Sequence, residues 1–251
     1  LGAAYEAWYN RIGDLYDGSV NESAKGRASG WAKGQALQWA ASSVQAGLGF
    51  LTRLAIRRLA WTPQNEALTA ALAVLRPYRG GSAVEPIPEL YERLRRQIGA
   101  HLQHESALGD DEDAEEDEWV PDPDALTELL CQGISLLQSP AANAKWEALS
   151  SIIDASEGER IVFFAQPVET VGVVADFLER RYGQRPSIII GNQSEQERRA
   201  QVNRFQADDG PRFLVSSRAG GEGLNMQRAR RLVHLDVPWN PMELEQRIGR
   251  V

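Results

Sequence analysis

Short apolar runs that alternate with amphipathic helical patterns constrain the fold of this chain most strongly. The runs contain few polar residues, which is typical of strands buried on both faces of a sheet. Strands that alternate with helices predict a parallel sheet with right-handed crossovers. The sequence therefore predicts an α/β fold, in which helices flank a parallel sheet built from "RIVFFA" (160–165), "PSIII" (186–190), "PRFLVS" (211–216) and "RRLVHLDV" (230–237).

The residues before position 140 follow a helical period instead. A stretch rich in Gly, Ser and Ala (17–35) is typical of a linker, and residues 35–60 carry one long apolar face. A proline is tolerated in the first helical turn, so Pro63 predicts a helix over 63–76. Further helices are expected over 88–103 and 123–138.

The change of period divides the chain into two predicted regions. We expect an all-helical region over 1–140, followed by the α/β domain over 141–251. His101 and His104 lie three residues apart on a predicted helix. A metal site would need further ligands, so two surface histidines are the favoured interpretation.

One acidic segment accounts for the net charge of −8 of the 251-residue chain. The stretch "DDEDAEEDE" (110–118) contains eight acids, and the rest of the chain is neutral without them. Such a run repels itself and buries no apolar surface, so we expect residues 109–119 to form an exposed loop. The minority alternative is a regulatory mimic of nucleic acid.

The composition excludes several classes of protein. Cys131 is the only cysteine, which excludes an internal disulfide and a cysteine zinc site and fits a cytoplasmic protein. No apolar run approaches the roughly 20 residues of a membrane span, and the N-terminus lacks the pattern of a signal peptide. Both ends interrupt a sequence pattern, so we expect this chain to be a piece of a longer protein.

Polar, glycine-rich loops follow the predicted strands. Ligands of parallel sheets gather at the carboxyl ends of the strands. Glycines in such a loop let its backbone approach a phosphate or a nucleic-acid backbone closely. Ser194 and Glu197 also form a capping box that opens the next helix. The sequence therefore predicts a site along one edge of the sheet, formed by "FAQP", "GNQS", "SSRAGGEGLN" and "DVPWNP".

The last predicted helix combines an apolar side with an arginine edge. Leu244, Ile248 and Val251 share one face at helical spacing, and Gln246 and Arg250 lie four residues apart on a neighbouring face. A guanidinium offers bidentate donors and a permanent charge, which suits a phosphate. A solvated surface arginine is the alternative for this residue considered alone.

In chain order, "IVFFAQ", "IIIGNQSEQER", "FLVSSRAGGEGLN", "HLDVPWNP" and "EQRIGR" resemble the second RecA-like lobe of superfamily 2 helicases. The sequence is most similar to the Swi/Snf-like branch, which includes bacterial ATPases that recycle RNA polymerase. The resemblance covers about residues 141–251. It is weaker over 1–140, where "FLTRLAIRRLAWTP" is similar to helices that link the two lobes of such bacterial enzymes.

The resemblance implies roles at the nucleotide for four residues. Arg250 matches the arginine finger of the family, and Gln246 matches the polar residue that leads the same motif. Gly223 and Asn225 match the positions closest to the nucleotide. A second finger would follow three residues after Arg250, where the sequence gives no residue to assign.

The resemblance also implies a nucleic-acid track and a coupling turn. The track is formed by residues of the loops that follow two strands, and the coupling turn lies between the two surfaces. The matching positions are Ser216, Ser217, Gly191 and Ser194 for the track, and Trp239 and Asn240 for the turn.

Two functions remain open at this stage. In the first, the chain is the second motor lobe of an ATP-dependent translocase on nucleic acid, with double-stranded DNA expected from the family. ATP and Mg²⁺ would then be held largely by a first RecA-like lobe, because a Walker A loop needs Gly-Lys and the chain has no such dipeptide. This chain alone is therefore expected to be inactive. The alternative is a non-catalytic module whose helical region binds a protein partner.

Overall fold

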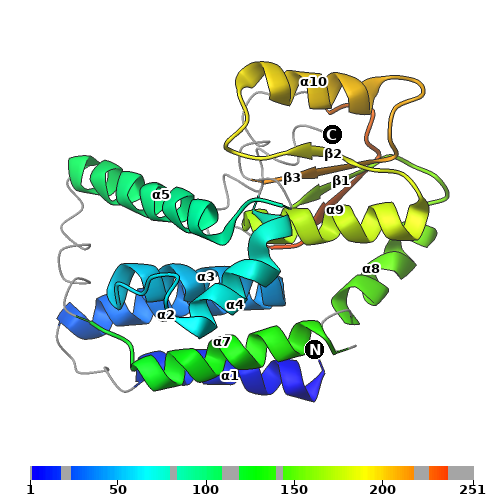
Figure 1. Ribbon diagram of the computed structural model, residues 1–251. Coiled ribbons are helices and arrows are strands. Elements are labelled where there is room, and N and C mark those ends of the chain that lie inside the picture. Colours follow the sequence, from blue (N-terminus) through cyan, green and yellow to red (C-terminus); the bar gives the residue numbers. More distant parts are fainter. Residues whose placement is uncertain are drawn as a thin grey trace. The chain divides into compact units, whose positions relative to one another are not determined.

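The computed structural model describes the chain outside a few short segments (Figure 1). Contacts between residues divide it into two compact units, Leu1–Ala144 and Lys145–Val251. None of the described helices is both long and apolar enough to cross a membrane. The described residues are 2–17, 24–79, 84–108, 119–139, 144–217 and 226–236.

The first unit is helical in its described part, as the sequence predicts. The predicted helices over 88–103 and 123–138 are confirmed, and Pro123 occupies the first turn of its helix behind the N-cap residue Asp122. The elements are α1 (Ala3–Asp17), α2 (Ala24–Ser42), α3 (Val44–Arg58), α4 (Glu66–Leu75), the 3-10 turn η1 (Arg76–Tyr78), α5 (Ile87–Leu108) and α7 (Pro123–Leu137).

Trp8 of α1 lies at the centre of this helical core. Its side chain is 2% exposed, and its indole N–H donates to the carbonyl of Leu129 at 2.9 Å. Gly47 of α3 and Gly133 of α7 contact the same ring so closely that an added Cβ would lie 2.6 Å and 2.8 Å from it. Glycine is therefore required at both positions by the close approach of two helices to one indole.

Two predictions for the first helices are wrong. The stretch 17–35 is not a linker throughout, because α2 begins at Ala24 and packs against α1 and α3. The apolar pattern over 35–60 is also not one helix. Ser43 has an extended backbone (φ −161°, ψ 159°), and its hydroxyl accepts the N–H of Ala46 at 3.0 Å. A serine that caps α3 therefore ends one helix and starts the next.

The predicted start of the third helix is also wrong. Pro63 precedes the helix rather than opening it, and α4 begins at Glu66. Asn65 is the N-cap residue, and its side chain accepts the N–H of Leu68 at 3.0 Å. The helix starts after the asparagine because its side chain satisfies a free N–H group, and not at the proline two residues before it.

The second unit contains a parallel sheet with the strand order β2-β3-β1-β4. The two inner strands, β1 and β3, are fully buried, whereas β4 at one edge is only partly buried. The predicted fold class is therefore confirmed. The elements are α8 (Ala144–Asp154), β1 (Ile161–Phe164), α9 (Val168–Tyr182), β2 (Ser187–Ile189), α10 (Glu195–Gln206), β3 (Phe213–Ser216) and β4 (Arg231–His234).

Helices cover both faces of this sheet (Figure 1). On one face, Val202 and Phe205 of α10 pack against Val162 and Phe164 of β1, with Leu214 of β3 beside them. The other face carries α9 and α8, where aromatic rings pack at centroid distances of 5.2–6.4 Å. Because neither face is left to solvent, the strands can consist of continuous apolar residues.

Two arginines at the amino ends of the strands have structural roles. Arg160 donates to the carbonyls of Ala207 and Asp208 just past α10, at 2.6 Å and 3.1 Å. Arg212 donates to the carbonyl of Ile153 at 2.9 Å. Both guanidiniums satisfy carbonyl groups that helix ends and turns leave without a partner.

Candidate functional site

The carboxyl ends of the four strands lie side by side at one edge of the sheet. Hydrogen bonds between backbone groups continue the sheet beyond its last paired residues. Ala165 donates to the carbonyl of Ser216 at 3.0 Å, and Ser217 donates to that of Ile189 at 2.8 Å. Leu235 donates to the carbonyl of Phe164 at 2.9 Å. The loops that the sequence predicts as a site therefore start from one rigid edge.

The loop after β2 is held by its own glutamine. The Gln193 amide accepts the N–H of Ile190 at 3.0 Å and donates to the carbonyl of Ile188 at 3.1 Å. The backbone N–H of Gln193 also donates to the carbonyl of Ile190 at 3.2 Å. These bonds fix the path of the chain on both sides of Gly191, so the loop offers a preformed backbone surface.

Gly191 is exposed, and the fold itself does not require a glycine there. An added Cβ at Gly191 would meet no atom within 4 Å, and the backbone does not have a positive φ. Gly210 provides the contrast, because a Cβ there would lie 2.1 Å from the carbonyl oxygen of Arg204. The open space at Gly191 is consistent with a ligand that approaches this loop from outside.

The hydroxyl of Ser194 is engaged in the predicted capping box, which is confirmed. Ser194 Oγ accepts the N–H of Glu197 at 3.2 Å and donates to Glu197 Oε2 at 2.8 Å. The same carboxylate oxygen accepts the backbone N–H of Ser194 at 2.7 Å, and these bonds lower the pKa of Glu197. A phosphate oxygen only accepts hydrogen bonds, so Ser194 would have to release Glu197 before donating to one.

The two serines at the carboxyl end of β3 are buried. Ser216 is 0% exposed, and its hydroxyl donates to the carbonyl of Ser217 at 2.9 Å. Ser217 is 8% exposed. Neither side chain presents much surface at this edge in the structure, and their assignment to a nucleic-acid track stays a prediction.

The other predicted site positions lie outside the described residues. These include the nucleotide set, the coupling turn and nearly all of the acidic loop over 109–119. The side chains of His101 and His104 are also outside the described part. The site positions are Gly223, Asn225, Trp239, Asn240, Gln246 and Arg250.

Two side-chain contacts at the same edge were not predicted. Asp236 follows β4, is 8% exposed, and accepts the N–H of Gln166 at 3.0 Å. Lys145 of α8 donates to the carbonyl of Leu235 at 3.3 Å. Burial lowers the pKa of Lys145, and the negative charge of Asp236 opposes that shift. No local pattern indicates these contacts, because the residues that form each of them lie far apart in the sequence.

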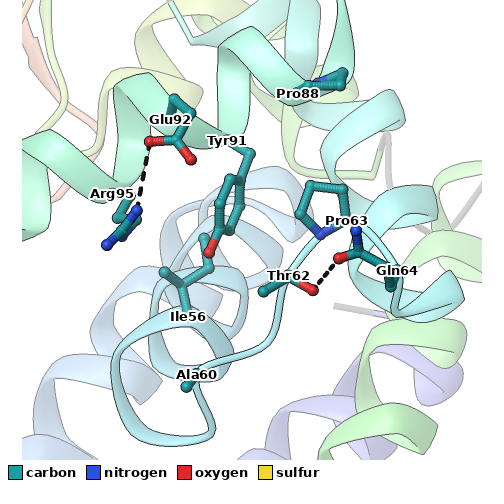
Figure 2. A pocket seen from close by; sticks show the side chains of 9 residues that line it. All are labelled: Ile56, Ala60, Thr62, Pro63, Gln64, Pro88, Tyr91, Glu92 and Arg95. Carbon is teal, nitrogen blue, oxygen red and sulfur yellow. Dashed lines mark hydrogen bonds and ion pairs between the residues drawn. The ribbon is translucent and has the colours of Figure 1, made fainter.

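An open pocket of about 600 Å³ lies within the helical unit. Figure 2 shows that Ile56, Pro63, Pro88 and Tyr91 line it together with charged and polar side chains. The Tyr91 side chain is 8% exposed, and its hydroxyl has no hydrogen-bond partner among the described residues. The pocket can therefore accept an apolar group that also offers an acceptor to this hydroxyl.

Within the described ranges, no group of three or more His, Cys, Asp or Glu side chains could hold a metal ion. The residues expected to contact a nucleotide, Gly223, Asn225 and Arg250, also lie outside these ranges. The described edge of the sheet therefore contains a preformed backbone loop, and the nucleotide contacts stay a prediction.

Residues 144–251 match the family model described as "Helicase conserved C-terminal domain". The chain is 31% identical over 110 residues to YwqA of Bacillus subtilis, which carries the provisional name of an ATP-dependent helicase/translocase. It is 38% identical over 95 residues to the RNA polymerase-associated protein RapA of Vibrio parahaemolyticus. It is 33% identical over 105 residues to the DNA repair and recombination protein RAD54B of Gallus gallus.

These matches cover 43%, 38% and 41% of this chain, and 12%, 10% and 11% of the respective relatives. The chain thus spans about a tenth of the length of the curated relatives it matches. It is also similar to the solved SWI2/SNF2 ATPase C-terminal domain of Sulfolobus solfataricus, at 23% identity and a TM-score of 0.37, over 72% of this chain and 70% of that one. Residues 144–251 of this chain accordingly match the conserved C-terminal domain of helicases and resemble the second RecA-like lobe of superfamily 2 enzymes of the Swi/Snf-like branch.

Proposed function

We propose that this chain is the second motor lobe of an ATP-dependent translocase that moves along double-stranded DNA. The match of residues 144–251 to the helicase C-terminal family carries the proposal. The names of YwqA, a helicase/translocase, and RAD54B, a DNA repair protein, support the same chemistry. The four strand ends at one edge supply the scaffold on which such a lobe builds its contacts.

The nucleotide contacts belong to the residues after β3 and β4. Arg250 directs a guanidinium at the phosphates of ATP, with Gln246 from the same motif and Gly223 and Asn225 beside the nucleotide. ATP, as its Mg²⁺ complex, supplies the energy of phosphoryl transfer. We assign the phosphate loop and the Mg²⁺ ligands to a first RecA-like lobe outside these 251 residues, because the chain has no Gly-Lys dipeptide.

The nucleic-acid contacts belong to the loops after β2 and β3. Gly191 exposes its backbone, and the bonds of Gln193 keep this loop in one shape. A rigid loop that exposes its backbone at a glycine can approach a phosphate backbone closely. Trp239 and Asn240 then couple this surface to the nucleotide. With DNA as its track, the protein works in the cytoplasm.

Replacement of Arg250 in the protein that carries both lobes tests this proposal. An arginine finger meets the charge that develops during phosphoryl transfer, and such fingers contribute on the order of 10³-fold to turnover. Arg250→Ala should therefore lower DNA-stimulated ATP hydrolysis by about two to three orders of magnitude. Arg250→Lys should rescue poorly, since an ammonium cannot reproduce the planar fork. Steady-state ATPase assays with and without DNA measure both effects.

The control for Arg250 is an exposed arginine on another helix. Arg199 of α10 pairs with Glu195 at the surface, and Arg199→Ala should leave turnover within about twofold. Melting temperatures establish that all variants fold. Near-normal turnover of a folded Arg250→Ala protein would remove this residue from the nucleotide site.

A second candidate function, a protein-interaction module, is favoured by the pocket of the helical unit (Figure 2). A largely apolar pocket lined by Tyr91, whose hydroxyl has no partner among the described residues, fits an apolar anchor of a bound protein. Because the relative RapA is named for its association with RNA polymerase, we propose that enzyme as the first partner to test. This role can accompany the motor function or replace it.

A charge placed at the rim of the pocket tests whether the pocket binds a protein partner. Pro88 is exposed and lines the pocket, and Pro88→Glu should weaken binding to purified RNA polymerase by about tenfold. Ala73→Glu on the exposed side of α4 is the matched control and should bind normally. Equal binding by the two variants would exclude the pocket as the contact.

A further inference from the structure

We propose that Arg198 binds a phosphate of the DNA backbone beside the loop after β2. This inference rests on the proposed function, which places DNA at the loops after β2 and β3. It adds a charged side chain to a surface whose other assigned members are one glycine and three serines. Arg198 is suited to this role by its place on α10, its burial and its lack of a partner among the described residues.

Arg198 lies on the side of α10 that faces the sheet. It precedes Val202 by four residues and Phe205 by seven, and both of these side chains pack against the strands. Its backbone N–H donates to the carbonyl of Ser194 at 3.0 Å, so Arg198 lies one turn from the start of the helix. Helical side chains lean toward the N-terminus of their helix, so that of Arg198 leans toward the loop that contains Gly191.

The guanidinium of Arg198 has no partner in the described part of the chain. Arg198 is partly buried, its Nε is buried, and no hydrogen bond or ion pair joins its guanidinium to another described residue. Arg160 and Arg212, the other two partly buried arginines described in this unit, both donate to carbonyl groups. Because a buried polar group without a partner costs free energy, the exception at Arg198 indicates a ligand from outside the protein.

The carboxylates nearest to Arg198 in sequence are engaged elsewhere. Glu195 pairs with Arg199 at 2.5 Å. Glu197 accepts the N–H of Ser194 at 2.7 Å and its hydroxyl at 2.8 Å. Because this capping box occupies the hydroxyl, the serine cannot donate to a phosphate. Arg198 can therefore supply the charged donors that the serine does not, in the planar geometry that suits a phosphate.

The open space at Gly191 and the charge of Arg198 suit the same ligand. A Cβ at Gly191 would meet no atom within 4 Å, so the backbone of a ligand can come close to this loop. DNA carries one negative charge per phosphate, and proteins contact these phosphates mainly through basic and polar side chains and backbone N–H groups. Such a contact positions the strand and does not read its sequence.

The salt dependence of DNA binding by the two-lobed protein tests this contact. Arg198→Met removes the charge and keeps an apolar stem over the sheet. In titrations without nucleotide, its affinity for duplex DNA should fall by about tenfold, and the slope of log Kd against log salt should fall by about one, because one phosphate contact is lost. Arg198→Lys keeps the charge and should retain the slope. The melting temperature of Arg198→Met should not fall, because no described group loses a partner.

Arg199 provides the matched control. It carries the same charge at the next position of α10 and already pairs with Glu195 at the surface. Arg199→Met should therefore bind duplex DNA within about twofold of the parent and with the same salt slope.

Three results would overturn the inference. The first is an unchanged salt slope in a folded Arg198→Met protein. The second is a marked fall in the melting temperature of this variant, which indicates a structural role. The third is a raised KM for ATP with normal DNA affinity, which places the guanidinium at the nucleotide. If the parent does not bind duplex DNA, the proposed function fails together with this contact. Normal binding by the parent and by Arg198→Met alike refutes the contact alone.

Discussion

At the scale of single residues, the fold requires a glycine at position 210 but not at position 191. The fold leaves open space where a side chain at Gly191 would be, whereas Gly210 is required because a Cβ there would collide with the backbone at Arg204. Gly191→Ala should therefore leave the melting temperature unchanged, and Gly210→Ala should lower it. Thermal unfolding of the two variants measures the contrast.

A charge at Gly191 tests the nucleic-acid surface. Gly191→Glu places a carboxylate where we expect a phosphate backbone, so DNA affinity at low salt should fall by about tenfold. Ser151→Glu on the exposed side of α8 adds the same charge elsewhere and should bind DNA like the parent. The measurement is a DNA titration in the absence of nucleotide, and equal affinities would move the track away from this loop.

At the scale of elements, an ion pair anchors the start of α5. Arg93 of α5 donates to both carboxylate oxygens of Glu85, at 3.1 Å and 2.6 Å, and to the carbonyl of Arg79 at 3.0 Å. The Glu85 and Arg93 side chains are 15% and 22% exposed. The hydrogen bonds from Arg93 lower the pKa of Glu85 below its usual value of 4.5.

This lowered pKa makes the stability of the helical unit depend on pH. A carboxyl group with a depressed pKa in the folded state contributes stability above its unfolded pKa and loses it as the pH falls through the folded pKa. Glu85→Gln should therefore cost about 1 kcal/mol at pH 7, and the difference should shrink below about pH 4.5. Urea unfolding across this range measures it. A constant difference at all pH values would contradict the ionic origin, and the exposed Glu89→Gln serves as the control.

The elements also show which parts of the sequence encode their own structure. The capping box of Ser194 and Glu197 and the N-cap of α7 act within four residues, so the sequence predicts these helix starts. Ser43 belongs to the same class of signal, yet the apolar pattern on both sides of it favours one continuous helix. The periodicity is unchanged across the break, so only the backbone angles of Ser43 reveal the boundary.

At the scale of the whole molecule, the chain combines an α/β unit, the proposed motor lobe, with a helical unit that has its own core. We expect the isolated 251 residues to show no ATPase activity above background, with or without DNA. The chain has no Gly-Lys dipeptide for a phosphate loop, and none of its described carboxylates clusters as metal ligands. A phosphate-release assay on the purified chain checks this. Turnover by this chain alone would contradict the two-lobe proposal.

The sequence alone determined the fold class and the motifs of this protein. The tertiary structure decided how the edge of the sheet that carries the loops is built. Strand and helix periods are local properties, so the parallel sheet, the order of its loops and the helicase motifs can be predicted from the sequence. The contact between Lys145 and Leu235 joins residues 90 positions apart, and the burial of Ser216 depends on which strands become neighbours. Such contacts follow from the strand order β2-β3-β1-β4, which no local pattern encodes.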